Sequence, residues 1–416
     1  MIFTSFVSSL VATTAALGVV PQDSPAQSAQ AQIDELSRRI DLLSAELETL
    51  GFDESLVAAM DSLRTRGISP TASRVYDSDG SVSIGGYGEA FYENQAGGNG
   101  DNSDSLRTVL YVGKRLGENF VFNSEIEFEH GGTSGGGSAS AEFAYVDWLM
   151  KPSLNLRAGL LLVPMGIVNE LHEPTTFLPV GRPRVEQRIM PSTWRENGVG
   201  AYGDVGGFSY TAYLVNGLDA SGFSDAGLRG GRQKGSRALT EDVAFVLSVD
   251  YNEQPGLVIG GSAYFGDSGQ GQAALGDAET TIGEVHVDYR REGWRARALY
   301  AMAKLDDVET LNAGLGLTGA DSVGEELNGG YVEVGYDVMS VLDSESRQSL
   351  LPYLRYEQFD TQAAVPTAFA SNPSNDETIV TLGVAYQPNS QVIFKAEYED
   401  FDEGRDQWNL SVGYVF

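Results

Sequence analysis

The sequence contains no cysteine, so neither disulfide bonds nor thiolate metal sites are available to this 416-residue chain. Beyond the first twenty positions it has no run of eighteen apolar residues, which excludes a membrane-spanning helix there. Basic residues are scarce, with 27 Lys and Arg against 58 Asp and Glu, and the formal charge of −31 argues against a nucleic-acid partner. Glycine and tyrosine are abundant, at 50 and 19 residues, which suits many short turns and interfacial aromatic side chains.

The N-terminus has the pattern of an export signal. Residues 2 to about 20 are mainly apolar, and Ala29-Gln30-Ala31 is an A-x-A pattern typical of a cleavage site. We therefore expect residues 1–31 to be a signal peptide. The usual basic start is missing, because the first Lys or Arg is Arg38. A mis-assigned start, an unusual leader and an uncleaved anchor are the alternatives.

A helical segment is expected next, over residues 32–70 in the periplasm. Its apolar residues are spaced 3-4-3-4-3, as in the seam of a coiled coil, and they are Ile33, Leu36, Ile40, Leu43, Leu47 and Leu50. Self-association through this seam is favoured over one amphipathic helix packed on its own domain. Ile at the first seam position nominally favours two strands, so dimer and trimer both stay open. Contact with the cell wall, which would make the chain a structural tether, is a further alternative.

From residue 81 onward the sequence predicts strands. Sixteen candidates can be delimited, at 81–93, 105–116, 119–130, 139–150, 154–163, 196–205, 207–216, 242–252, 256–266, 279–291, 294–304, 328–340, 350–359, 376–387, 391–402 and 406–416. Several alternate clearly between apolar and polar residues. In 294–302, for example, Trp294, Tyr300 and Met302 share one face, and Arg295 and Arg297 share the other.

The connections between these strands alternate between short and long. Short ones include 117–118, 151–153 and 292–293, whereas long ones include 164–195 and 217–241. Short turns at one end and long loops at the other are typical of an outer-membrane barrel. We therefore predict an all-β fold, a sixteen-stranded antiparallel transmembrane β-barrel over residues 75–416, wide enough for a water-filled lumen.

The last strand carries an apolar stripe that ends on an aromatic residue. Its members are Trp408, Leu410, Val412, Tyr414 and Phe416. A closing barrel strand shows such a stripe to lipid and places aromatic residues at the interface. The ending also resembles the C-terminal assembly signal of bacterial outer-membrane proteins, which implies the barrel-assembly machinery as a partner. The alternative is the edge strand of a soluble sandwich.

Four motifs give a more specific resemblance. They are Gly85-Gly86-Tyr87-Gly88-Glu89, Pro164-Met165-Gly166, His172-Glu173-Pro174 and the run Thr193-Trp194-Arg195-Glu196-Asn197-Gly198. Together they resemble bacterial porins of the phosphate-selective O and P type, over roughly residues 75–416. The resemblance implies a homotrimeric sixteen-stranded channel whose third external loop folds into the lumen. The longest loop, 164–195, is indeed the third on the long-loop side.

This loop is the expected pore constriction. Its charged residues are Arg182, Arg184, Arg188, Arg195, Glu170, Glu173 and Glu186. A substrate role for the arginines and ion pairing with neighbouring glutamates are equally weighted interpretations. The strand pattern predicts a lumen wall on which positive and negative charges nearly balance. The positive residues are Arg107, Arg157, Arg290, Arg295, Arg297, Arg355 and Lys395, and the negative residues are Glu125, Glu127, Glu129, Glu284, Asp288, Glu357, Glu397 and Glu399. This balance favours a general porin for small hydrophilic solutes and ions, with weak selectivity.

A second basic cluster lies in the next long loop. Arg229, Arg232, Lys234 and Arg237 have no acidic neighbours in sequence, so they are expected at the pore mouth. They would draw in anions such as phosphate or bind lipopolysaccharide phosphates at the rim. The arginine ladder and lysine cluster of the phosphate-selective family have no residue-by-residue match here.

An outer-membrane hydrolase is the competing interpretation from another class. It needs a nucleophile with a positioned base, and only His130, His172 and His286 are available. No nucleophile elbow or zinc-binding HExxH motif occurs. We expect each histidine to be a hydrogen-bonded polar residue, no enzymatic activity, no cofactor and no metal.

Overall fold

The computed structural model describes residues 67–416, except for 97, 99, 344–345 and 403. The predicted signal peptide, and the coiled-coil segment up to residue 66, lie outside this part of the chain. The tether hypothesis, which depends on that segment, stays a prediction. Among the described residues, no helix combines the length and apolarity that a bilayer crossing requires.

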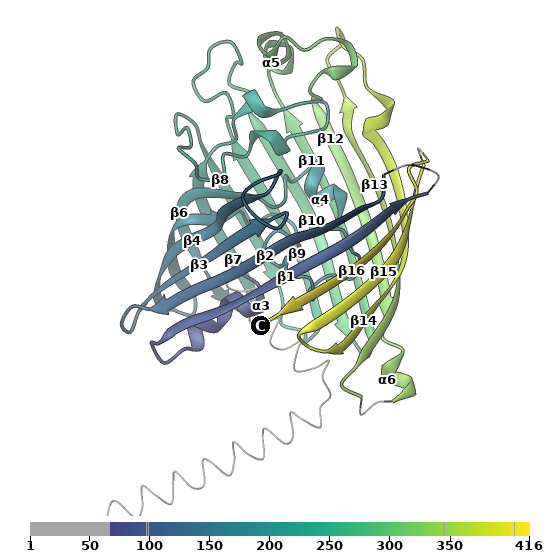
Figure 1. Cartoon of the computed structure of the whole chain (residues 1–416). Helices are drawn as coiled ribbons and strands as arrows, with labels where there is room; N and C mark the ends of the chain where they lie inside the picture. The colour runs from purple at the N-terminus through teal and green to yellow at the C-terminus, as the bar shows by residue number, and fades with distance from the viewer. Residues whose placement is uncertain (1–66, 97, 99, 344–345, 403) are drawn as a thin grey trace, which may run out of the picture. The chain divides into compact units, whose positions relative to one another are not determined.

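The described chain is dominated by sixteen antiparallel strands that close into one barrel (Figure 1). Each strand pairs with its neighbours in sequence, and β1 pairs with β16 to close the ring. The strands are β1 (Val82–Gln95), β2 (Asn102–Arg115), β3 (Phe120–Glu129), β4 (Ser138–Lys151), β5 (Leu154–Leu162), β6 (Arg195–Val205), β7 (Phe208–Asn216), β8 (Val243–Tyr251), β9 (Leu257–Gly266), β10 (Thr280–Arg291), β11 (Trp294–Leu305), β12 (Glu326–Tyr336), β13 (Ser349–Ala364), β14 (Asp376–Asn389), β15 (Val392–Phe401) and β16 (Gln407–Val415).

The number and order of the predicted strands are confirmed. The twelfth prediction ran too far, because β12 ends at Tyr336 instead of residue 340. Asp337 explains the stop: its Oδ1 accepts hydrogen bonds from Met339 N at 3.0 Å and Leu350 N at 2.9 Å. The Asp337 side chain thereby takes the place of a backbone carbonyl as hydrogen-bond acceptor, so strand pairing ends and a turn begins.

Short helices occupy the two ends and the interior of the barrel. They are α3 (Pro70–Ser73), η1 (Arg74–Asp77), α4 (Arg184–Arg188), η2 (Ala220–Gly222), η3 (Arg229–Gly231), α5 (Val308–Leu315), η4 (Gly319–Asp321), α6 (Met339–Leu342) and η5 (Pro373–Asn375). Figure 1 shows α3 and α6 at the end where the C-terminus lies, and α5 at the opposite end. The first is the short-turn end, because it holds connections such as 152–153, 206–207 and 292–293. The second is the long-loop end.

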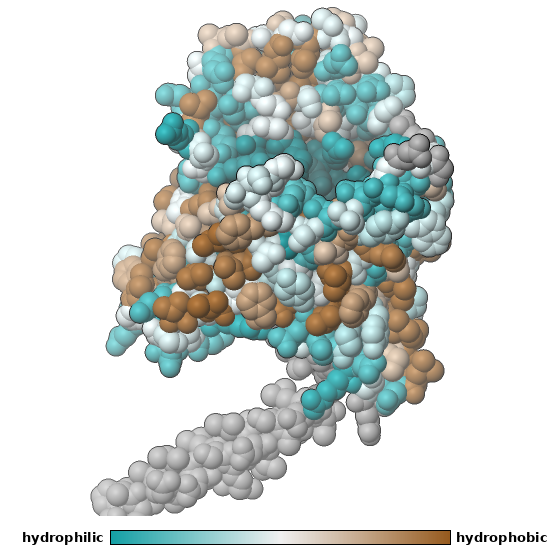
Figure 2. Space-filling model, viewed as in Figure 1, coloured by the Kyte–Doolittle hydropathy of each residue, from teal (hydrophilic) through white to brown (hydrophobic). Residues whose placement is uncertain are grey.

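An apolar belt covers the outer face of the strands. On β16, Trp408 is 56% exposed and Leu410 50%, whereas the alternating Gln407 and Asn409 are buried. Tyr414 and Phe416 are exposed as well, so the C-terminal stripe faces outward as predicted. Figure 2 shows brown, apolar residues gathered over the strands and teal residues around a hollow near the long-loop end. The assembly role of the stripe stays a prediction.

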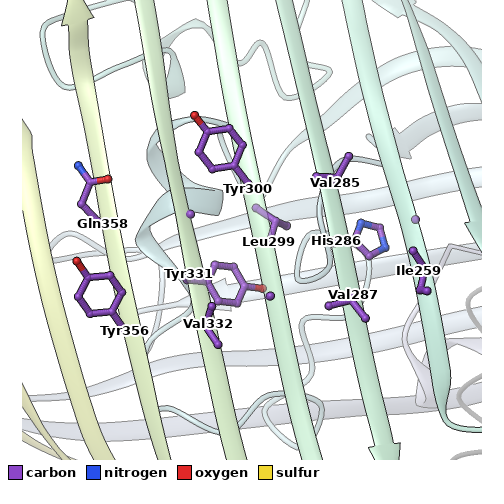
Figure 3. A pocket seen from close by; sticks show the side chains of 13 residues that line it. Ile259, Val285, His286, Val287, Leu299, Tyr300, Tyr331, Val332, Tyr356 and Gln358 are labelled. Carbon is purple, nitrogen blue, oxygen red and sulfur yellow. The ribbon is translucent and has the colours of Figure 1, made fainter.

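The belt is not smooth. Between β9 and β13 a groove of about 700 Å³ is bordered by exposed apolar side chains, including Val285, Tyr300, Val332 and Tyr356 (Figure 3). Small residues, Gly330 and Ala298, also line it. Because its rim consists of outward-facing residues, the groove belongs to the lipid-facing surface and not to the lumen.

We predict that charge on this belt destabilises the barrel. Leu382 lies in the middle of β14 and is 57% exposed. Leu382→Arg should lower the free energy of unfolding in lipid by about 2–4 kcal/mol, because the guanidinium must sit in hydrocarbon. Denaturant titration in vesicles measures this value. The control Ser134→Arg, at an exposed loop position, should stay within about 0.5 kcal/mol of the parent, and equal losses would contradict the membrane-facing assignment.

Candidate pore constriction

The third long loop, residues 163–194, folds into the barrel. Its base is closed by a backbone hydrogen bond from Val163 N to Trp194 O at 3.0 Å and by the side chain of Asn169. Asn169 Nδ2 donates hydrogen bonds to the carbonyl oxygens of Val163, at 2.6 Å, and Trp194, at 2.9 Å. Its Oδ1 accepts from Trp194 N at 2.6 Å. A buried amide that uses both its donor and its acceptor in this way fixes the two ends of the loop together.

From this base the loop crosses to the wall formed by β10–β15, and the wall's cations bind its carbonyl groups. Arg290 and Arg297 both donate to the carbonyl oxygen of Thr176, at 3.0 and 2.7 Å. Further along the loop, Lys395 Nζ donates to Pro179 O at 2.8 Å, and Arg355 Nη1 donates to Gly181 O at 3.2 Å. The loop therefore contacts both sides of the barrel.

The loop also approaches the short-turn end closely. A Cβ atom added at Gly413 of β16 would lie 2.5 Å from the Cβ of Pro174. A contact that short is sterically forbidden, so only glycine fits at this position. This explains why the lumen-facing side of β16 carries glycine next to the C-terminus.

Glutamates of the loop and of the wall hold α4 in place. Glu186 Oε2 accepts hydrogen bonds from the backbone N–H groups of Ile167, at 3.1 Å, and Val168, at 2.7 Å. Tyr331 of β12 donates its hydroxyl to Glu186 Oε1 at 2.8 Å. Val185 N donates to Glu357 Oε1 at 2.6 Å. Glu186 thus connects the start of the loop, α4 and the β12 wall.

Residues 67–77, which we call the inner N-terminal segment, occupy the short-turn half of the lumen. Thr71 N donates to Glu173 Oε1 of the third loop at 3.0 Å. Tyr76 donates its hydroxyl to Asp147 Oδ2 at 2.6 Å, beside Arg157, whose guanidinium lies 4.0 Å from the Tyr145 ring centroid. The sequence pattern did not predict a segment inside the lumen, although the apolar Ile68, Val75 and Tyr76 occur here without strand alternation.

The predicted lumen-facing residues lie on the inner face of the barrel, where the third long loop and the inner N-terminal segment cover them. The side chains of the six principal ones are at most 9% exposed, and they are Arg295, Arg297, Arg355, Lys395, Glu125 and Glu127. Their charges are used in hydrogen bonds and ion pairs within the protein. These side chains border a polar protein interface, and their role in lining a conducting lumen stays a prediction.

The predicted constriction residues divide into two groups. Glu173 and Glu186 are buried and accept hydrogen bonds from backbone N–H groups, and the carbonyl of Glu170 accepts from Ser69 Oγ at 3.2 Å. Arg195 is the first residue of β6 and donates to Glu142 of β4 at 2.8 Å. Glu173 and Glu186 therefore bind backbone N–H groups, and Arg195 binds a carboxylate of the barrel wall.

The remaining loop arginines form a group with the first two members of the second basic cluster. We call Arg182, Arg184, Arg188, Arg229 and Arg232 the arginine group. Burial, followed by the charges of Arg232, Arg182 and Arg188, lowers the pKa of Arg229 to about 9. Nε and Nη2 of Arg182 and Nη1 of Arg229 are buried without a hydrogen-bond partner among the described residues.

The second basic cluster is only partly united by the structure. Arg232 Nη1 donates to the carbonyl of Thr193 in the third loop, and its Nε donates to Arg229 O at 2.9 Å. Arg229 itself lies close enough to the third loop for the charges of Arg182 and Arg188 to act on it. Lys234 and Arg237 are exposed instead. The sequence showed that these cations lacked acidic neighbours, but only the fold shows that two of them join arginines 40 to 50 positions earlier in the chain.

Carboxylates accompany all three histidines. His130 Nδ1 lies 2.5 Å from Asp104 Oδ2, and His172 Nε2 lies 3.2 Å from Glu125 Oε1. His286 contacts Glu284 at 3.0 Å and Asp250 at 3.2 Å. The prediction that each is a hydrogen-bonded polar residue is confirmed.

We predict that Glu186 keeps the third loop closed. Glu186→Ala removes the acceptor of two backbone N–H groups and one hydroxyl, and each buried donor left unpaired costs about 1–3 kcal/mol. Trypsin should then cut after Arg184 or Arg188 at least about tenfold faster than in the parent, as measured by mass spectrometry. Glu309→Ala, at an exposed position of α5, is the control. Unchanged cleavage in Glu186→Ala would contradict the bracing role.

Comparison with solved structures shows the same fold. OmpF of Salmonella typhi, in a complex with daunomycin, matches with a TM-score of 0.55 and 12% identity, covering 82% of this chain and 99% of that one. A loop-deletion mutant of OmpT from Vibrio cholerae gives 0.53 and 12%, covering 82% and 100%. An anion-selective porin from Comamonas acidovorans gives 0.51 and 14%, covering 81% and 100%. These identities establish a shared fold alone.

The closed barrel and its apolar belt place the chain in the bacterial outer membrane. No model of a known protein family matches the sequence. An uncharacterized protein of Aquifex aeolicus (strain VF5) is 36% identical over 371 residues, which cover 84% of this chain and 83% of that protein. The chain therefore belongs to the same family as this Aquifex aeolicus protein, and its fold is the sixteen-stranded barrel seen in outer-membrane porins.

Proposed function

We propose that the chain is an outer-membrane porin: a narrow channel for passive diffusion of small hydrophilic solutes and ions, with a weak preference for anions. The observation that supports the preference is the arginine group, which joins the third and fourth long loops inside the barrel mouth. Selectivity in pores depends on such local groups of charge and not on net charge. The total of −31 is therefore compatible with anion passage.

The acidic residues nearest the third loop are already engaged. Glu357 accepts from Val185 N, Glu397 accepts from Val180 N at 2.8 Å, and Glu186 binds two backbone N–H groups. Nε and Nη2 of Arg182 and Nη1 of Arg229 have no hydrogen-bond partner among the described residues, although the charge of Glu142 acts on both guanidinium groups. A passing anion supplies the missing acceptor, whereas a passing cation meets repulsion.

Other features of the sequence analysis remain predictions. They are the homotrimer and the phosphate preference, both implied by the family resemblance, together with lipopolysaccharide binding by the second basic cluster and recognition by the barrel-assembly machinery. An oligomer that resists SDS and converts to monomer on heating would support the trimer. We propose no enzymatic activity, since the sequence has neither a nucleophile elbow nor a zinc-binding HExxH motif.

We predict that the arginine group sets the ion preference. In planar bilayers with a KCl gradient, the parent should conduct ohmically. Its reversal potential should have the sign expected for a channel that prefers chloride over potassium. Removing one unit charge about 6 Å from an ion in a water-like medium changes their interaction by ~0.7 kcal/mol, or about threefold. Arg229→Ala/Arg232→Ala should therefore lower the anion-to-cation permeability ratio by at least about threefold.

Lys304→Ala is the matched control for this experiment. Lys304 is exposed at the outer rim of β11 and pairs with Asp306, so its removal should leave the ratio unchanged. Absence of conductance in well-folded protein would reject the porin, and conductance with no dependence on the arginines would reject their role. Saturable block by phosphate, weakened in the double variant, would separate a phosphate channel from a general one.

We further predict that the inner N-terminal segment narrows the channel. Tyr76→Ala removes a buried ring and the hydroxyl that binds Asp147, so single-channel conductance should rise. Tyr92→Ala removes a rim tyrosine bonded to Asp101 and should have no such effect. Equal conductance in both variants would show that the segment lies outside the conducting path.

A further inference from the structure

Three side chains converge where the third loop enters the lumen. Glu125 of β3, Glu142 of β4 and His172 of the loop each offer one ligand atom, and these atoms lie within 4.8 Å of one another. The three residues are 0%, 1% and 1% exposed. A histidine and two carboxylates, fully withdrawn from solvent, form a donor set that divalent transition metals accept.

The hydrogen bond at the other ring nitrogen determines what His172 presents to the carboxylates. Its Nδ1 lies 2.8 Å from the carbonyl oxygen of Asn169, which can only accept, so Nδ1 carries the proton. In the neutral ring Nε2 then has a free lone pair. It points toward Glu125 Oε1 at 3.2 Å and Glu142 Oε2 at 3.5 Å. Arg195 and Arg182 already place positive charge near Glu142, and three acceptors facing one another favour a further cation between them, either a second proton on the ring or a metal ion.

Two oxygens of the cluster lack hydrogen-bond partners among the described residues. They are Glu125 Oε2 and Glu142 Oε2, both buried. The opposite oxygen of Glu142 accepts from Arg195 at 2.8 Å, and Glu125 Oε1 lies 3.4 Å from the Tyr87 hydroxyl. Buried carboxylate oxygens are costly without a partner. One added proton on His172 can form a good hydrogen bond with only one of the two carboxylates, whereas a metal ion can bind both.

The distances fit a metal ion as well as they fit a hydrogen bond. Zinc binds histidine nitrogen and carboxylate oxygen at about 2.0–2.1 Å in tetrahedral sites, which places neighbouring ligand atoms ~3.3–3.4 Å apart. The two Nε2–oxygen distances of 3.2 and 3.5 Å bracket this value. The Asn169 carbonyl is the kind of outer partner that orients metal-binding histidines.

His286 provides a contrast within the same barrel. Its Nδ1 lies 3.0 Å from Glu284 Oε2, and its Nε2 lies 3.2 Å from Asp250 Oδ1. Carboxylates on opposite sides of the ring suit a doubly protonated imidazolium. No single point can be bonded by both acids and the ring, so His286 is a matched control for His172.

We propose that Glu125, Glu142 and His172 bind a divalent transition metal ion of the Zn²⁺ type, which fixes the third loop to β3 and β4. The three residues leave one tetrahedral position for water. The ion would hold the loop from the near wall, as Glu186 and the wall cations hold it from the far wall. Binding does not depend on conductance, so this inference and the proposed function can fail separately.

The test measures metal content and affinity in the folded, detergent-solubilised protein. After treatment with EDTA and dialysis, calorimetric titration with Zn²⁺ should give one equivalent per chain, and elemental analysis should recover one bound ion. His172→Ala and Glu142→Gln should each weaken binding at least about tenfold, whereas His286→Ala should leave it unchanged. Zn²⁺ should also slow trypsin cleavage after Arg184 and Arg188 in the parent but not in His172→Ala.

Two results would overturn the proposal. Absence of a saturable site at one equivalent in the parent overturns the proposal and leaves a protonated His172. Equal weakening in His286→Ala and His172→Ala also overturns it, because binding then arises elsewhere. Heat-modifiable mobility on SDS gels reports folding for each variant. If His172→Ala fails to fold, Glu125→Gln replaces it, and the parent titration decides on its own.

Discussion

The bilayer requires that every backbone N–H and C=O group within it be paired, and the pairing of β1 with β16 closes the ring that meets this requirement. Nine residue pairs, from Tyr87–Val415 to Gln95–Gln407, form that seam. Phe416 extends it, since its N–H and C=O groups both pair with Gly86. Because this pairing leaves no free edge, the wall is rigid enough to hold charged groups in its interior.

Inside the barrel, charged side chains pair with backbone N–H and C=O groups of the third loop. Arginines and lysines of the β10–β15 wall bind carbonyl oxygens of the third loop, and glutamates bind its N–H groups. A loop without regular secondary structure must satisfy its own polar backbone when it is buried. The charged wall therefore serves as the hydrogen-bonding partner that a sheet or helix would otherwise provide.

The strand pattern predicted the barrel well, because alternation is a local property of the sequence. Trp294, Arg295 and the C-terminal stripe all face the predicted sides. The site was predicted only in part, since burial of Arg355 or Lys395 depends on a loop more than 170 residues away in sequence. The grouping of Arg182 with Arg229 and the path of residues 67–77 depend on the same long-range packing. No local pattern encodes such contacts, although the missing acids around Arg229 were a usable sign.

The inner N-terminal segment has a consequence for the order of assembly. Thr71 contacts Glu173 and Ala72 contacts Asn123, so the segment lies between the loop and the wall, with sequence separations of 102 and 51 residues. Such contacts carry a loop-closure cost that must be met before they stabilise anything. A finished cylinder offers entry only through its ends. The segment is synthesised before every strand, so the barrel is wrapped around a part of the chain that emerges before any of the wall.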